Sequence, residues 1–219
     1  MLGSGRRKKA GKPAARDPAR TREALLQAAF GEIYRSGYRG SDVETILGAA
    51  GVTKGALYHH FDGKDALGYA VVDEIVASIM RVKWQAPLQD AHDPVDALIG
   101  IVRSTSLSLE HVCGGCPLNN LSQEMSALDE GFRRRTAKVF NDWHRAVAAA
   151  LRDGRARGQV RKDVKPDEAA TFLIATYEGY LSLAKNSQDA KALRAGQRAL
   201  VRYLESLRPR RSGKAESSS

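Results

Sequence analysis

The chain has little cysteine, few aromatic side chains and no long apolar run, and these shortages exclude several classes of protein. Two cysteines in 219 residues rule out a disulfide-stapled scaffold. No window approaches the roughly 18 consecutive apolar residues that a membrane-spanning helix needs, so we expect no membrane partner. The N-terminal segment is charged but no apolar stretch follows it, which argues against a secretory signal. We therefore expect a cytoplasmic protein.

The net charge of +10 is confined to the two ends of the chain. Residues 1–22 hold eight basic side chains against one acid, and residues 208–219 hold four against one, so residues 23–207 sum to zero. Both ends are rich in Gly, Lys, Arg, Ser and Pro, a composition that cannot bury apolar surface. We expect residues 1–17 to form a disordered basic arm within reach of a phosphate backbone, and residues 208–219 to form a disordered, solubilising tail.

Strand signals are weak throughout, whereas helix signals recur. Polar and apolar residues show no sustained alternation, and no Asn-Gly or Asp-Gly turn joins two β-branched runs. Caps, or prolines at first helical positions, precede apolar residues at helical spacing and mark helix starts near Asp17, Ser41, Thr53, Asp62, Asp93, Cys116, Asp129, Lys165 and Asp189. The sequence predicts an all-α fold of about nine helices, with 42% apolar residues to fill its core.

Three of these helices carry more detailed expectations. Ser41 and Glu44 have the spacing of a capping box, which would begin the second helix. The helix that begins at Pro94 is expected to reach about His111. The fourth helix is expected to bury one stripe, made of Leu67, Val71, Ile75, Ile79 and Val82.

The stretch VTKGALYHHF, residues 52–61, follows a short helix and the turn Ala50-Gly51-Val52. A glycine-containing turn between two short helices is typical of the helix-turn-helix unit, whose second helix enters the DNA major groove. One face of this stretch has the spacing to pack inward. The other face is left for DNA and consists of Thr53, Lys54, Gly55, Tyr58 and His59.

Each outward residue suits a contact with DNA. Lys54 can donate to a guanine edge or a phosphate, and Gly55 lets the backbone approach closely. Tyr58 and His59 offer donors to phosphate oxygens, which fix register rather than sequence. Further affinity is expected from Ser41, Thr45 and Lys64. We predict no metal site at His59 and His60, because adjacent helical positions diverge by about 100°.

Residues 22–67 resemble the DNA-binding region of the TetR family of bacterial transcriptional regulators. The similar motifs are Gly37-Tyr38, AlaGlyVal at 50–52, GlyAlaLeuTyr at 55–58, Phe61 and Lys64. The resemblance implies a three-helix head over residues 18–66 and a body over residues 67–207 that forms a dimer and holds a ligand pocket. It also implies repression relieved by a small-molecule effector. If the protein is a dimer, its two heads would bind a near-palindromic operator. Helix four joins the two parts and is expected to carry the movement.

The segment HVCGGCPLNN, beginning at His111, is the second stretch that could carry chemistry. One Cys-x-x-Cys pair falls short of a structural zinc set, and no strand precedes it as in dithiol oxidoreductases. Cys116 stands at a helix N-terminus, where the helix dipole favours thiolate. Simple burial of a small apolar residue is the competing interpretation, and it is favoured over a reactive role. Residues 116–125 are similar to Gly-Cys-Leu-x-x-Asn-Leu-x-x-Glu in a TetR subgroup of the AcuR and NemR kind, which implies a place beside the ligand cavity.

The body offers candidates for a ligand pocket and for a dimer contact. A pocket is mostly apolar with a few polar groups, and the candidates are Trp84, Cys116, Asn120, Met125, Phe140, Trp143, His144, Phe172 and Tyr177. Plain core packing is the competing interpretation for each of them. Leu193, Leu200 and Leu207 recur every seven residues, which favours a two-fold contact through the last two helices or packing within one chain.

Together these patterns predict a dimeric, ligand-responsive DNA-binding regulator, without catalytic residues, metal or cofactor. Two alternatives stay open. One is a regulator that senses thiols or electrophiles through Cys116. The other is a non-specific nucleic-acid-binding protein whose affinity resides in the charged ends and depends on salt rather than on sequence.

Overall fold

The computed structural model describes residues 17–210, which form helices joined by short loops and, within that range, no strand. The expected all-α fold is confirmed. Most of the predicted arm and tail, residues 1–16 and 211–219, lies outside the described part. The elements are α1 (Pro18–Ser36), α2 (Val43–Ala50), α3 (Lys54–His60), α4 (Lys64–Ala70), η1 (Val71–Val76), α5 (Ala77–Met80), η2 (Arg81–Gln85), α6 (Ala86–Gln89), α7 (Pro94–Arg103), α8 (Leu109–Gly114), α9 (Pro117–Met125), α10 (Glu130–Ala156), α11 (Pro166–Ser187) and α12 (Ala190–Ser206).

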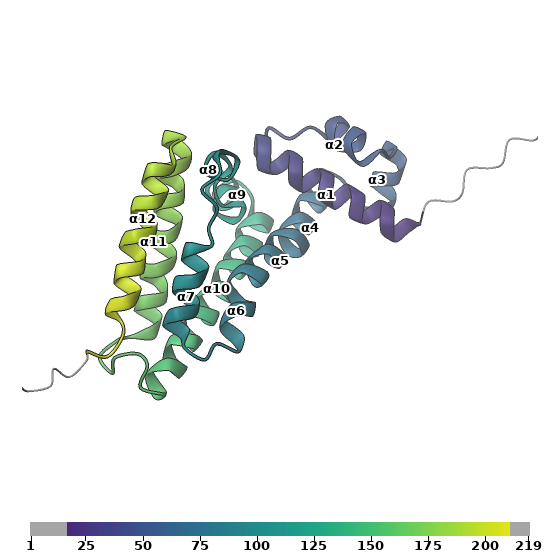
Figure 1. Cartoon of the computed structure of the whole chain (residues 1–219). Helices are drawn as coiled ribbons and strands as arrows, with labels where there is room; N and C mark the ends of the chain where they lie inside the picture. Colours follow the sequence, from purple (N-terminus) through teal and green to yellow (C-terminus); the bar gives the residue numbers. More distant parts are fainter. Residues whose placement is uncertain (1–16, 211–219) are drawn as a thin grey trace, which may run out of the picture.

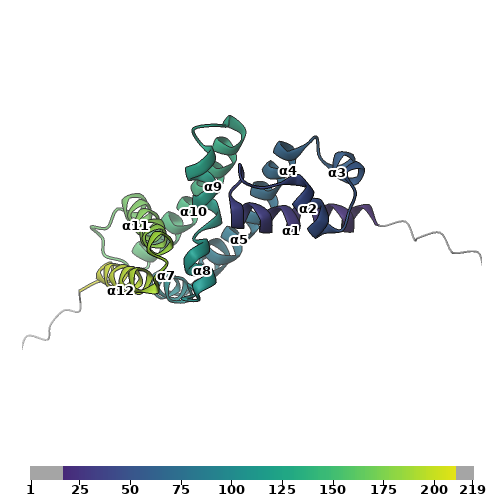
Figure 2. The same ribbon diagram turned by 90° about the horizontal axis from the view of Figure 1, so that it is seen from above.

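The helices form two groups with one long connection (Figure 1). We call α1–α3 the head and α7–α12 the body. The elements from α4 to α6 continue one another as a single helix that runs from the head along the body. Figure 2 shows the same division from above, with α9 beside one end of α1. Within residues 17–210, no helix combines the length and the apolar character needed to cross a bilayer.

Helix starts follow local capping chemistry, with one correction. The capping box predicted at Ser41 and Glu44 is wrong by one residue, because Asp42 is the N-cap and its carboxylate accepts from the Thr45 amide at 2.8 Å. The Ser41 hydroxyl instead donates to the Tyr38 carbonyl at 2.7 Å, inside the turn that follows α1. Gly51 ends α2 in the left-handed conformation, with φ of 64°, as the sequence predicted.

The long connecting helix buries a different stripe from the one predicted. Leu67 and Val71 are buried and Ile75 packs against the core, but the expectation is wrong for Ile79 and Val82, which are exposed, Val82 by 66%. Residues four apart drift by about 40° per step around an α-helix of 3.6 residues per turn. The wider turns of the π-helical segments η1 and η2 rotate the stripe back toward the core. The buried residues therefore recur every four positions: Val72, Val76, Met80, Trp84 and Leu88.

The helix predicted from Pro94 to about His111 is interrupted. It ends at Arg103, and α8 starts at Leu109. The segment between them is rich in hydroxyl side chains, which compete with helical backbone hydrogen bonds. The Ser104 hydroxyl donates to the Ile101 carbonyl at 2.8 Å, and Ser108 caps α8. This interruption places Thr105, a buried residue, in the interior of the body.

The leucine repeat of α12 packs within its own chain. Leu193, Leu200 and Leu207 are all buried in the single chain, so this stripe is not a free dimer surface, and that part of the dimer interpretation is wrong. The repeat faces the body because α12 lies against α11 and α7. The residues left exposed on α11 are different ones, and they include Phe172 and Leu183.

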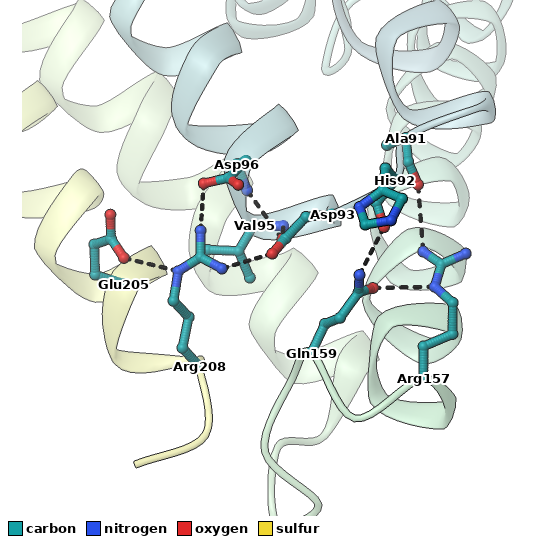
Figure 3. Close-up of polar contacts among 9 residues, drawn as sticks. All are labelled: Ala91, His92, Asp93, Val95, Asp96, Arg157, Gln159, Glu205 and Arg208. Atoms are coloured by element: carbon teal, nitrogen blue, oxygen red, sulfur yellow. Dashed lines mark hydrogen bonds and ion pairs between the residues drawn. The ribbon is translucent and has the colours of Figure 1, made fainter. Parts of the chain in front are cut away.

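Polar contacts close the end of the body that lies away from the head (Figure 3). The Arg208 guanidinium binds the Asp93 carboxylate at 2.7 Å, the Glu205 carboxylate at 2.9 Å and the Asp96 carboxylate. Burial opposes the charge of Asp93, yet the bond from Arg208 and the backbone amides of α7 hold the pKa of Asp93 below its usual value. Arg208, where the tail was expected to begin, is thus tied to the start of α7.

Candidate DNA-binding and effector sites

Helix α3 presents a continuous exposed face. Leu57 is its buried residue and packs into the core of the head. The five residues predicted to face DNA are all exposed, and Tyr58 shows 57% of its surface although it is a large aromatic residue. No glycine in this helix is needed for packing, since a Cβ on Gly55 would meet only the Thr53 hydroxyl at 3.9 Å. The face is therefore open to a partner along its whole length.

Neighbouring polar residues hold this face in place. Thr53 caps α3 by accepting from the Ala56 amide at 3.3 Å. The Thr45 hydroxyl donates to the Asp42 carboxylate at 3.0 Å and remains exposed on α2. The Lys54 ammonium lies 3.9 Å from the Glu44 carboxylate, an exposed and weak pairing that leaves the cation available.

The structure places two of the predicted DNA contacts differently. Ser41 is buried, so its side chain supports the turn after α1. Lys64 reaches back into the head, donates to the Ser41 carbonyl at 2.7 Å and lies over the Tyr38 ring, 4.8 Å from its centroid. Both residues fix the position of α4 against the head.

A group of aromatic rings fills the interior of the body. Trp84 and Trp143 are fully buried, with ring centroids 4.5 Å apart, and the Tyr177 ring stands edge-on to Trp84 at 4.9 Å. Phe140 stacks beside Trp143 at 6.2 Å. These four predicted pocket residues come from η2, α10 and α11, and the fold brings them together.

Polar groups adjoin the aromatic rings. The Lys83 ammonium donates to the Tyr177 hydroxyl at 2.5 Å, and the same hydroxyl lies 2.9 Å from the Thr105 hydroxyl. Burial lowers the pKa of Lys83 and raises the pKa of Glu178 to about 7, against the smaller lowering effects of the Cys116 thiol and Lys83. We call Lys83, Thr105, Cys116, Tyr177 and Glu178 the interior cluster.

Several buried polar atoms near this cluster have no hydrogen-bond partner of standard geometry among the described residues. They are the indole nitrogens of Trp84 and Trp143, Nε2 of His111, the Tyr180 hydroxyl and both carboxylate oxygens of Glu178. Although the Cys116 thiol influences the pKa of Glu178, it does not make such a bond to either oxygen. Unpartnered buried polar groups are uncommon in folded proteins and call for an explanation.

Cys116 is not poised as a nucleophile. Its thiol is buried, and burial together with the nearby Glu178 charge raises its pKa well above the usual value. The amides of Leu118 and Asn119 at the start of α9 act in the opposite direction but more weakly than burial. The expected effect of the helix dipole is therefore outweighed by desolvation, since thiolate is the reactive form.

The side chains of the other pocket candidates contact residues outside the interior cluster or pack in the general core. Asn120 donates to the Gly114 carbonyl at 2.8 Å and accepts from Lys185 at 2.9 Å. His144 is bound between α10 and α11, with Nε2 3.1 Å from the Asp167 carbonyl. Phe172 is exposed and packs on Tyr203. Met125 is buried in the general core near the end of α9.

Sequence reasoning missed four members of this region: Lys83, Thr105, Glu178 and Tyr180. The signal for Glu178 was present, because this acid follows Tyr177 within the apolar stripe of α11. Thr105 gave no such signal, since its position depends on the interruption between α7 and α8.

Comparison with known proteins finds matches for both the head and the body. Residues 25–71 match the family described as bacterial regulatory proteins, tetR family, and residues 94–200 match the family described as tetracyclin repressor-like, C-terminal domain. A solved TetR transcriptional regulator from Chloroflexus aurantiacus superposes with a TM-score of 0.77 at 30% identity, covering 87% of this chain and 97% of that one.

Two similar relatives are named regulators. The HTH-type transcriptional repressor DhaR of Mycobacterium sp. is 31% identical over 180 residues, which cover 82% of this chain and 88% of DhaR. The transcriptional regulator AcuR of Cereibacter sphaeroides is 30% identical over 190 residues, 86% of this chain and 87% of AcuR. The predicted similarity to the AcuR subgroup is thereby confirmed. The chain belongs to the TetR family of transcriptional regulators, with a helix-turn-helix DNA-binding domain and a ligand-binding C-terminal domain, and it is a regulator and not an enzyme.

Proposed function

We propose that this protein represses transcription in the cytoplasm by binding a near-palindromic operator as a dimer, and that a small-molecule effector releases it. The observation that carries the proposal is the exposed face of α3, where five residues suited to DNA contact stand together without a packing role. A helix-turn-helix unit presents such a face to the major groove.

Within the head, base reading is assigned to the N-terminal half of α3. Thr53 and Lys54 face the base edges, and Gly55 permits the close approach of the backbone. Tyr58, His59 and Thr45 contact phosphates and fix the register. Ser41 and Lys64 contribute indirectly, through the bond that holds α4 to the head.

The dimer contact is assigned to the outward face of α11 together with α12. Leu183 is 65% exposed and Phe172 49%, and the small exposed residues Ala175 and Gly179 between them allow another helix to approach closely. An isologous contact of these helices gives a four-helix bundle. The two heads then bind half-sites about 34–36 Å apart, or a multiple of that spacing.

The effector site is assigned to the interior cluster and its aromatic rings. Two unpartnered indole donors and the Glu178 carboxyl lie beside an apolar aromatic wall, the mixture typical of a ligand pocket. Release requires that the effector bind more tightly to the state whose heads are wrongly spaced, because a ligand with equal affinity for both states shifts nothing.

The test is a footprint on the DNA upstream of the protein's own gene, at physiological salt with excess random competitor. We expect protection of two half-sites related by a near-palindrome. Lys54→Ala should lose sequence preference at one base step of the operator. Lys138→Ala is the control: it removes the same charge from an exposed position on α10 and should bind as wild type does. If repeated trials on other DNA show only uniform coverage that follows salt, the protein is a non-specific binder instead.

A further inference from the structure

Helix α9 is bonded to the head at both of its ends. Before its first turn, the Tyr34 hydroxyl of α1 donates to the Gly115 carbonyl at 2.9 Å. At its last turn, the Glu124 carboxylate accepts from the backbone amides of Tyr38 and Arg39, each at 2.8 Å. We call the contact of Glu124 with these two amides the Glu124 clasp. The head is therefore attached to the body by α9 as well as by the long helix from α4.

The clasp depends on a close approach that only glycine permits. Gly37 precedes the two amides with φ of 76°, and a Cβ at this position would lie 2.9 Å from one Glu124 carboxylate oxygen. The acceptor is charged and binds two donors at once, so each bond is stronger than a neutral one. Glu124 and Asn120 are one helical turn apart in the segment NLSQE, and neither of them caps α9.

Helix α9 is also bonded to the body. The Lys185 ammonium of α11 donates to the Asn120 side chain at 2.9 Å, and the Asn119 amide donates to the Ser182 hydroxyl at 3.1 Å. Cys116, the N-cap of α9, belongs to the interior cluster. A displacement within that cluster thus reaches α9 directly.

A cleft of about 820 Å³ lies where α1, α9 and α11 meet, and its wall includes Tyr34, Gly37, Glu124 and Lys185. Figure 2 shows α9 beside the end of α1 at this place. The cleft gives α9 room to shift, and it leaves the Arg39 half of the clasp exposed to solvent and the Tyr38 half partly buried.

We propose that Glu124 is a positioning residue for DNA binding, whose clasp transmits movement of α9 to the head and so sets the angle of α3 toward the operator. The part of this role that concerns DNA binding rests on the proposed function above. The sequence suggested only the helix beginning at α4 as the carrier of movement; α9 provides a second and shorter connection, one helix away from the interior cluster.

The first test measures hydrogen exchange of single amides in the full-length protein, without DNA or effector. In Glu124→Ala we expect the amides of Tyr38 and Arg39 to lose at least about tenfold protection, because their acceptor is gone. Gln123→Ala is the matched control, since Gln123 lines the same cleft on the same helix but bonds weakly to Asn119. Glu124→Gln keeps one acceptor and should fall between the two.

The second test uses the operator fragment found by footprinting and copies with one or two base pairs inserted between the half-sites. Wild type and Gln123→Ala should lose about tenfold or more in affinity upon insertion, and Glu124→Ala much less, because its heads are no longer held at one angle. Base substitutions within a half-site should affect all three proteins alike, since α3 is unchanged.

The outcomes separate cleanly. Unchanged protection of both amides in Glu124→Ala overturns the clasp. Lost protection with an unchanged spacing preference shows that the clasp only supports the fold and overturns its positioning role. A wild type without preference for sequence or spacing contradicts the proposed function, and with it the role in DNA binding, while the exchange experiment still decides whether the clasp exists.

Discussion

At the scale of single residues, the fold does not require a glycine at position 55. It is the second residue of α3, where glycine costs up to about 1 kcal/mol relative to alanine, and a Cβ there would meet only the Thr53 hydroxyl at 3.9 Å. The absence of a Cβ therefore benefits contact with a partner and not the stability of the head.

We predict that Gly55→Ala stabilises the protein by about 0.5–1 kcal/mol and weakens operator binding by at least about tenfold. Chemical unfolding and fluorescence anisotropy with the operator fragment measure the two effects. Gly100→Ala is the control, because α7 is far from DNA and its glycine also has open space. Equal operator affinity of the two variants would show that α3 does not approach DNA through Gly55.

Glu178 gives a second prediction, on pH. Its native pKa is raised to about 7 from an ordinary value of 4.5, so between these values the native state binds more protons than the unfolded state. The stability that Glu178 contributes is therefore full at low pH and is lost as the pH rises toward and through 7.

From pH 5 to pH 8 we expect the unfolding free energy of wild type to fall, relative to Glu178→Gln, by on the order of 3 kcal/mol. Urea unfolding at both pH values measures this difference, and titrations shared by both proteins cancel. Glu168→Gln, an exposed acid on the same helix, should run parallel to wild type. If the unfolding free energies of Glu178→Gln and wild type change equally with pH, the pKa of Glu178 is not raised in the native state.

At the scale of elements, α4 packs against the head and the body at one point. A Cβ on Gly68 would lie 2.6 Å from the Tyr38 ring and 2.8 Å from the Phe132 ring, and these rings are 4.4 Å apart. The glycine lets α4 pass between the end of α1 and the start of α10. The orientation of the head therefore depends on this packing as well as on the Glu124 clasp.

Gly68→Ala should destabilise the protein by about 1–3 kcal/mol, because both rings are held and the added methyl overpacks the joint. Thermal unfolding measures the loss. Gly31→Ala, in the middle of α1 with open space around its Cβ position, should instead gain up to about 1 kcal/mol. A stable Gly68→Ala protein would show that the joint can spread without cost.

At the scale of the whole molecule, regulation depends on how two chains meet. Helix α11 lies on the side of the body away from the head (Figure 1) and carries exposed apolar residues, whereas the α12 leucines are buried inside the chain. A dimer through this face separates the two heads by a spacing that the bodies determine.

Leu183→Glu should convert the dimer to a monomer at micromolar concentration, since a charge within an apolar contact is left unpaired. Sedimentation velocity measures the mass, and operator footprints should shrink to half-sites or vanish. Val82→Glu places the same charge on an equally exposed apolar residue of η2 and should remain dimeric. If Leu183→Glu stays dimeric and Val82→Glu does not, the interface lies along the connecting helix.

The sequence alone determined the features that depend on neighbours along the chain. The caps at Asp17, Thr53 and Asp129, the left-handed Gly51 and the outward face of α3 are local, because each involves groups a few residues apart. Only the tertiary structure decided what depends on the phase and contact of distant helices. The π-helical turns determine which residues of the connecting helix are buried. Packing of α12 against α7 and α11 buries the α12 leucines within the chain. The interior cluster and the Glu124 clasp join residues more than 50 positions apart, and no local pattern specifies such a meeting.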